Sequence, residues 1–88
     1  MSSRRALKKK VNAIAGELFA ECVVNSHVDG VDQQKVYNLM TAVLHMADDF
    51  IQRINHTEPG NVKEFYKKFQ ADFDAEVQKI VDGIAELK

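Results

Sequence analysis

Histidine and acidic side chains have the spacing of one helix face at His45, Asp48 and Asp49. Residues three and four positions apart share one face of a helix, so an imidazole nitrogen and a carboxylate can meet there. His45, however, lies in the middle of a polar face, opposite Val43 and Ala47. Metal sites in helical bundles use ligands that project inward from several helices, such as paired Glu-x-x-His motifs, and the sequence has none. The pattern therefore predicts a solvated surface with no metal and no cofactor.

Cys22 is the single cysteine and the only thiol available for nucleophilic chemistry. It falls on an apolar stripe, where a cysteine behaves as a small hydrophobic residue. A reactive thiol needs a partly exposed, electropositive setting, which nothing on this stripe supplies. One cysteine also excludes an internal disulfide and agrees with a reducing compartment. We therefore expect no catalytic residue and no enzymatic activity.

Positive charge is concentrated at the start of the chain. Residues 1–10 contain five basic and no acidic residues, whereas the remaining 78 contain seven basic and thirteen acidic ones. The formal net charge of −1 hides this asymmetry. Such a cluster is typical either of a solvated tail or of a surface that binds a polyanion.

Three segments with helical periodicity must position these side chains. The strong turn signals are Asp29-Gly30 and Pro59-Gly60. Between them, apolar residues recur every three or four positions, which predicts helices over about 5–28, 32–55 and 61–87. Because the connections are short, consecutive helices must run antiparallel. The expected fold is an all-α, up-down-up three-helix bundle.

The chain is short enough to form one domain over residues 1–88, with 1–5 as a candidate flexible basic tail. Asp32 is the expected N-cap of the second helix. Asn61 and Glu64 have the spacing of a capping box at the start of the third helix.

The predicted helices are amphipathic, with apolar arcs that span nearly half of each circumference. The first arc is Leu7, Val11, Ile14, Leu18 and Cys22, widened by Ala15, Phe19 and Val23. The second is Val36, Leu39, Met40, Val43, Ala47, Phe50 and Ile54, with Tyr37, Leu44, Met46 and Ile51 at its shoulders. The third is Phe65, Phe69, Phe73, Val77, Ile80, Ile84 and Leu87. Arcs this wide suit contact with two neighbouring helices, and pairing of two chains is the main alternative.

The predicted topology brings most of the basic residues to one end of the bundle. The candidate anion-binding residues there are Arg4, Arg5, Lys8, Lys9, Lys10, Lys63, Lys67 and Lys68. Helix N-termini and cationic side chains both favour phosphate groups. The sequence pI of about 6.3 is well below the value above 9 that is typical of a dedicated DNA-binding domain. Any nucleic-acid contact is therefore expected to be electrostatic.

Phe19 and Val23 stand on the shoulder of an already wide apolar stripe. If the three-helix core leaves them exposed, they form a candidate dimer or partner surface. Simple packing within the core is the alternative.

The segments 4–10, 17–22 and 65–68, which read RRALKKK, ELFAEC and FYKK, resemble short, uncharacterised helical proteins from Bacteroidetes bacteria. The resemblance implies a bacterial, cytoplasmic origin and transfers no functional residue. The longest stretch without a charged residue is also too short for a membrane-spanning helix.

The sequence favours a small non-enzymatic interaction or scaffolding module whose partner is another protein or a second copy of the chain, with no small-molecule substrate. A polyanion-binding module that uses the basic end is the alternative function.

Overall fold

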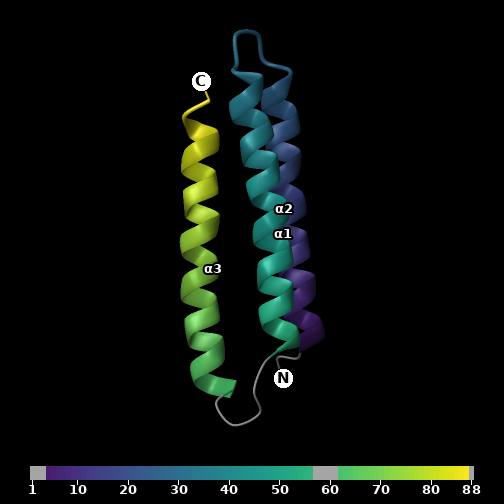
Figure 1. Ribbon diagram of the computed structural model, residues 1–88, viewed down its shortest axis with the longest axis vertical. Coiled ribbons are helices and arrows are strands. Elements are labelled where there is room, and N and C mark those ends of the chain that lie inside the picture. The colour runs from purple at the N-terminus through teal and green to yellow at the C-terminus, as the bar shows by residue number, and fades with distance from the viewer. Residues whose placement is uncertain (1–3, 57–61, 88) are drawn as a thin grey trace.

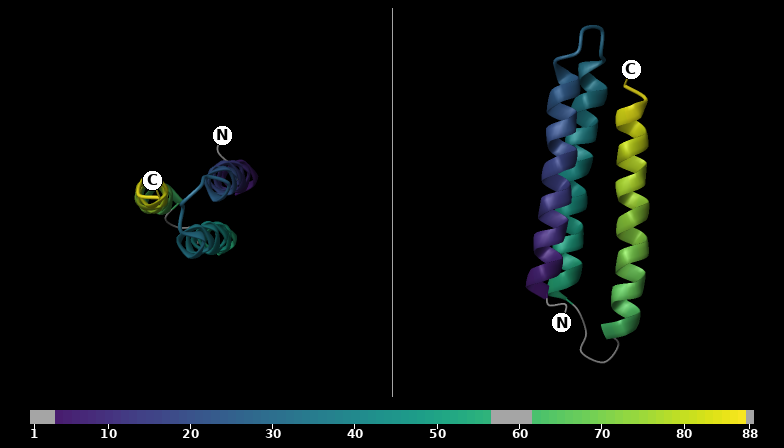
Figure 2. Two further views of the ribbon diagram at one scale, coloured as in Figure 1. Left: turned by 90° about the horizontal axis from the view of Figure 1, so that it is seen from above. Right: turned by 180° about the vertical axis from the view of Figure 1, so that it is seen from behind.

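The computed structural model describes residues 4–56 and 62–87. Within them the chain forms three helices, α1 (Arg4–Ser26), α2 (Gln33–Asn55) and α3 (Val62–Ala85). The helices run up, down and up along a rod with extents of 51 × 18 × 18 Å (Figure 1). Seen along the rod, they occupy the corners of a triangle (Figure 2). The predicted all-α three-helix bundle is confirmed.

The helix ends follow from local side-chain chemistry. α1 begins at Arg4, so Arg4 and Arg5 of the predicted flexible tail are helical, and residues 1–3 lie outside the described residues. Near its end, Ser26 Oγ donates to the carbonyl oxygen of Val23. The turn that follows contains Gly30 at φ 84°, a conformation that glycine adopts without strain.

The predicted N-cap of α2 is confirmed. Asp32 Oδ1 accepts hydrogen bonds from the backbone amides of Gln34 at 2.9 Å and Lys35 at 3.4 Å. These bonds satisfy two of the amides that the first turn of a helix leaves unpaired. The predicted cap residue of α3, Asn61, lies outside the described residues, whereas Glu64 lies in the first turn of α3.

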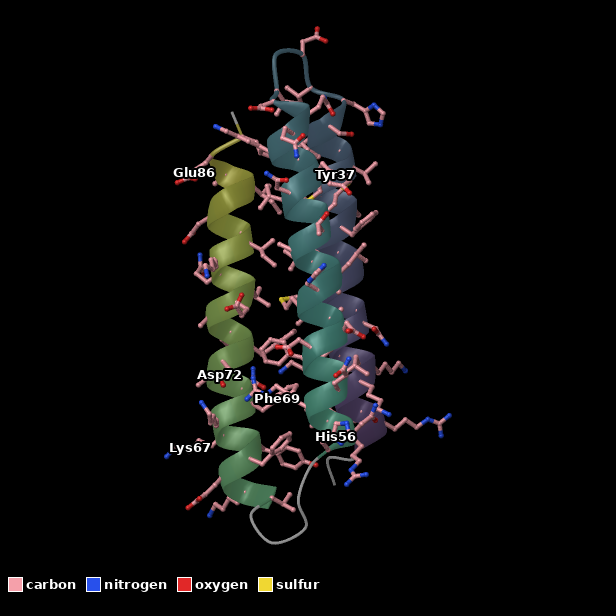
Figure 3. All side chains as sticks on the ribbon, viewed as in Figure 1. Tyr37, His56, Lys67, Phe69, Asp72 and Glu86 are labelled. Atoms are coloured by element: carbon pink, nitrogen blue, oxygen red, sulfur yellow. The ribbon has the colours of Figure 1, made fainter. Side chains whose placement is uncertain are left out.

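The main core lies between all three helices and is centred on aromatic rings. Its buried members are Val11, Ala15, Leu18, Val43, Met46, Phe50, Ile54, Phe69, Phe73 and Ile80. The ring of Phe50 meets those of Phe69 and Phe73 edge to face, with centroids 5.2 Å apart in both pairs. This geometry is worth roughly 0.5–1.5 kcal/mol per pair beyond the apolar area that is buried. Figure 3 shows Phe69 pointing from α3 into the space between the helices.

A second, smaller core closes the other end of the bundle. Cys22, Val36 and Leu87 are buried there, one from each of the three segments. At this end α3 comes close to α2, because a Cβ atom at Gly83 would lie only 2.7 Å from Cδ2 of Leu39. The position of α3 therefore depends on the phenylalanine rings of the main core at one end and on the close approach at Gly83 at the other.

The helices do not pack equally. α1 and α2 pack closely together as a hairpin, and α3 has fewer close backbone approaches to either helix. On α2, Met46 belongs to the buried core, although the sequence placed it at the shoulder of the apolar arc. The opposite shoulder, Tyr37 and Leu44, remains exposed to solvent by 63% and 59%. The reason is that α3 packs on the flank of α2 that carries Met46, so the described residues leave the other flank exposed to solvent.

In the described part of the chain, none of the helices combines the length and the apolar character needed to cross a lipid bilayer.

Candidate interaction surface

Large apolar side chains remain exposed on the hairpin formed by α1 and α2. Among the described residues the exposed large hydrophobic side chains are those of Val23, Val24, Val28, Tyr37, Leu44, Val62 and Val81. Five of these seven belong to the hairpin or to its connecting turn, and two belong to α3. Single exposed apolar residues are common on proteins, so the question is whether the five form one surface.

Two residues of α2 lie on the flank that faces away from α3. Leu39 approaches the backbone of α3, and Arg53 forms an ion pair with Asp72 of α3. At about 100° per residue, Tyr37 and Leu44 lie roughly half a turn around α2 from these two contacts. Figure 3 shows Tyr37 on the side of α2 that is remote from α3.

Two residues of α1 lie on the corresponding flank of that helix. Lys10 marks the side of α1 that faces α3, because its Nζ donates to Oε1 of Gln70 at 2.9 Å. Phe19 and Val23 lie roughly 140–180° around α1 from Lys10. Phe19 packs partly against the main core, whereas Val23 is 37% exposed.

The two flanks meet at the same level of the hairpin. Gln33 Nε2 donates to the carbonyl oxygen of Ser26 at 2.8 Å, which aligns the start of α2 with the end of α1. Val23 lies three residues before this contact and Tyr37 four residues after it, so they lie at nearly the same level along the rod. Of the five exposed residues, Val23, Tyr37 and Leu44 share this surface, whereas Val24 lies about 100° around α1 from Val23 and Val28 lies in the connecting turn. We call the surface formed by these three residues and the half-buried Phe19 the hairpin face.

A side-chain hydroxyl group on the hairpin face is already hydrogen-bonded to the backbone. Thr41 lies between Tyr37 and Leu44 along α2, and its hydroxyl donates to the carbonyl oxygen of Tyr37 at 3.0 Å. Because this hydroxyl already has an acceptor, covering it does not leave an unpaired donor. Thr41 can therefore be buried at small polar cost.

The basic residues predicted to bind an anion surround one end of the bundle. Two of them contact α3 side chains: Lys10 bonds to Gln70, and Lys68 Nζ lies 3.2 Å from Oδ2 of Asp72. Lys67 points away from the other helices (Figure 3). Because Lys67 and Lys68 are successive residues, their side chains diverge by about 100°. The cations share one end of the molecule but do not converge on one point.

Arg53 lies inside this basic end and joins α2 to α3. Its Nη2 donates to Oδ2 of Asp72 at 2.9 Å, and its Cζ lies 4.9 Å from the ring centroid of Phe50 and 5.7 Å from that of Phe69. The hydrogen bond from Arg53, followed by the one from Lys68, lowers the pKa of Asp72 below its ordinary value. This group is a structural junction, and Asp72 was not identified from the sequence. Its i, i+4 spacing from Lys68 was the available signal.

The residues with potential for catalysis are placed as follows. Cys22 is buried, and burial followed by the charge of Glu21 raises the pKa of its thiol. His45 is exposed on α2, and Oδ2 of Asp48 accepts from Gln52 at 3.1 Å. In residues 4–56 and 62–87, no three His, Cys, Asp or Glu side chains are grouped as metal ligands.

A groove of ≈ 780 Å³ follows the outer side of α2 and α3 and is open to solvent. Leu44, Met46 and Phe50 contribute apolar atoms to it, so Leu44 borders both this groove and the hairpin face. The Arg53–Asp72 ion pair occupies part of the groove wall. Its polar groups are thus either paired or exposed, and they do not converge on an enclosed point where a substrate could be held.

No protein-family model, curated protein or solved structure matches this chain. The function is therefore inferred from the geometry of the described residues.

Proposed function

We propose that this protein is a non-enzymatic protein–protein interaction module that self-associates through the hairpin face. The observation that carries the proposal is the gathering of exposed apolar side chains on the flank of the α1–α2 hairpin remote from α3. Contiguous apolar surface of this kind, with an aromatic residue at its centre, is characteristic of protein contact sites.

Covering the hairpin face offers a useful free-energy gain. Fully burying a leucine side chain contributes about 1.5–3 kcal/mol, so covering Leu44, which is 59% exposed, contributes about 1–2 kcal/mol. Tyr37 offers a larger ring together with a hydroxyl that can stay at the solvent rim. Both side chains project from a helix held by the main core, so little backbone order is lost on association.

The test is the mass of the protein in solution. Size-exclusion chromatography with light scattering at high micromolar concentration should give twice the chain mass of 10.0 kDa. Leu44→Lys should shift the protein to the monomer because it places a charge on the apolar face. Val81→Lys, at a site on α3 that is 41% exposed, is the matched control and should remain a dimer. A wild-type protein that stays monomeric at this concentration would refute the proposal.

A second candidate function is polyanion binding at the basic end, supported by the crowding of cations on helix segments that meet there. Labelled RNA and DNA titrated at low salt should bind with a strong salt dependence. The double variant Lys9→Gln/Lys67→Gln should reduce the salt slope by about one for each phosphate group that is no longer neutralised. Lys35→Gln/Lys79→Gln removes two charges elsewhere and is the control. Equal binding by both double variants would exclude the basic end as the site.

A further inference from the structure

We infer that the occupant of the hairpin face is a second copy of the chain in antiparallel orientation, an inference that rests on the proposed function. It is carried by the distribution of charge along the rod together with the position of the apolar residues on it. The two observations are independent, because one concerns the ends of the molecule and the other concerns one of its sides.

The two ends of the rod carry opposite charge. The basic end holds Arg4, Arg5, Lys8, Lys9, Lys10, Arg53, Lys63, Lys67 and Lys68, with Asp49, Glu64 and Asp72 as the nearby acidic residues, so positive charge is in clear excess there. The other end holds Asp29, Asp32, Asp82 and Glu86, with Lys35 as a nearby cation. Figure 3 shows the same polarity, with Lys67 and His56 near one end and Glu86 near the other. Two such rods packed side by side attract when they run antiparallel and repel when they run parallel.

The apolar residues fix how far the two copies overlap. The hydrogen bond between Gln33 and Ser26 sets these two residues at one level along the rod. Phe19 lies seven residues before Ser26 on α1, and Met40 lies seven residues after Gln33 on α2, so these two residues also share one level. This level is the centre of the hairpin face, and it lies nearer to the acidic end than to the basic end. A twofold axis through this level superimposes the apolar residues of both copies.

This overlap brings the charged ends of the two copies into register. Lys9 lies ten residues, or about 15 Å, from the level of Phe19 toward the basic end. Asp29 lies about as far in the other direction, in the turn after α1. In the antiparallel pair, Lys9 of each copy therefore lies at the level of Asp29 of the other, and both side chains are exposed. A parallel pair would instead bring the basic ends of the two copies together.

The hairpin also offers enough area for a stable dimer. About the central level the two copies overlap by about 15 Å in each direction, and a pair of helices about 10 Å apart presents a face about 20 Å wide. The resulting overlap of about 600 Å² per partner lies at the lower end of the range for specific interfaces, which bury about 1,200–2,000 Å² in total.

Distance measurement between spin labels tests the orientation. The label is attached at Gln52→Cys, an exposed position near the basic end of α2, in a Cys22→Ala background. Gln52 lies twelve residues from the central level, so an antiparallel dimer separates the two labels by about 35 Å along the rod. A parallel dimer holds them within about 25 Å. A short distance in a confirmed dimer overturns the antiparallel arrangement and leaves the proposed function standing, whereas a monomer overturns both.

Charge reversal gives a second readout on the full chain without labels. Lys9→Glu and Asp29→Lys should each weaken dimerisation by about threefold to tenfold, and the double variant should recover the wild-type dissociation constant. The recovery is specific to the antiparallel pair, because the parallel pair places like charges together in every one of these variants. Independent, additive weakening in the double variant would contradict the inference. On α3, Glu64→Lys controls for the change in net charge of Asp29→Lys, and Lys79→Glu controls for that of Lys9→Glu.

Discussion

Arg53 contacts a carboxylate and two aromatic rings at once, and this combination explains how a polar residue sits beside the core. Its guanidinium pairs with Asp72 on one side and lies over Phe50 on the other. Arginine suits this position because its planar group makes directed hydrogen bonds and stacks on rings. The junction joins α2 to α3, the helix with the fewest close backbone approaches to the others, so its loss should loosen that helix first.

This junction predicts a dependence of stability on pH. The pKa of Asp72 is lowered from 3.8, chiefly by the hydrogen bond from Arg53. A lowered pKa in the folded state means that the stabilisation is fully present above the unfolded-state pKa and is lost as the pH falls through the folded value. Urea unfolding of the wild type and Asp72→Asn should therefore differ at neutral pH and converge in strong acid. Asp74→Asn, at an exposed neighbouring position, is the control. A difference that persists unchanged at the lowest pH would contradict the assignment.

At the scale of the helices, much of the structure could be predicted from local pattern. The periodicity placed all three helices, and Asp32 is the predicted N-cap, because these features depend on neighbours along the chain. The pattern did not reveal which shoulder of α2 would be covered. A third helix can pack on either side of a hairpin, and both arrangements bury similar arcs. In the observed arrangement Met46 packs in the main core and Arg53 pairs with Asp72. Both are contacts between residues that lie far apart in the sequence.

The candidate surface was predicted only in part for the same reason. The sequence singled out Phe19 and Val23 because they lie at the edge of a wide stripe. Tyr37 and Leu44 have the same edge position on α2, but their exposure depends on where α3 packs. The predicted anion-binding residues share one end as the topology required. The contacts of Lys10 with Gln70 and of Lys68 with Asp72 depend on side-chain positions that the sequence spacing alone does not determine.

Gly16 and Gly30 offer a paired test of helix and turn energetics. Gly16 is exposed within α1, and no atom lies within 4 Å of a Cβ added there. Gly16→Ala should therefore stabilise the protein by about 0.5–1 kcal/mol, because alanine has less backbone freedom to lose on folding. Gly30 has equal space but a φ of +84°, so Gly30→Ala should destabilise the protein.

Chemical denaturation of both glycine variants measures the two changes in the free energy of unfolding. Because the added methyl group meets open space in each case, the difference between them isolates backbone conformation. Two changes of the same sign would contradict this explanation.

For the molecule as a whole, the unequal packing of the helices has a consequence for the order in which the chain folds. The six residues between α1 and α2 close a short loop, so contacts within the hairpin form with a small loss of chain entropy. We expect Val43→Ala, within the hairpin, to slow folding, and Ile80→Val, on α3, mainly to speed unfolding. Stopped-flow kinetics across a range of denaturant concentrations separates the two effects, and a slower folding rate for Ile80→Val alone would reverse this order. The same hairpin that presents the exposed apolar residues would then be the folding nucleus on which α3 condenses.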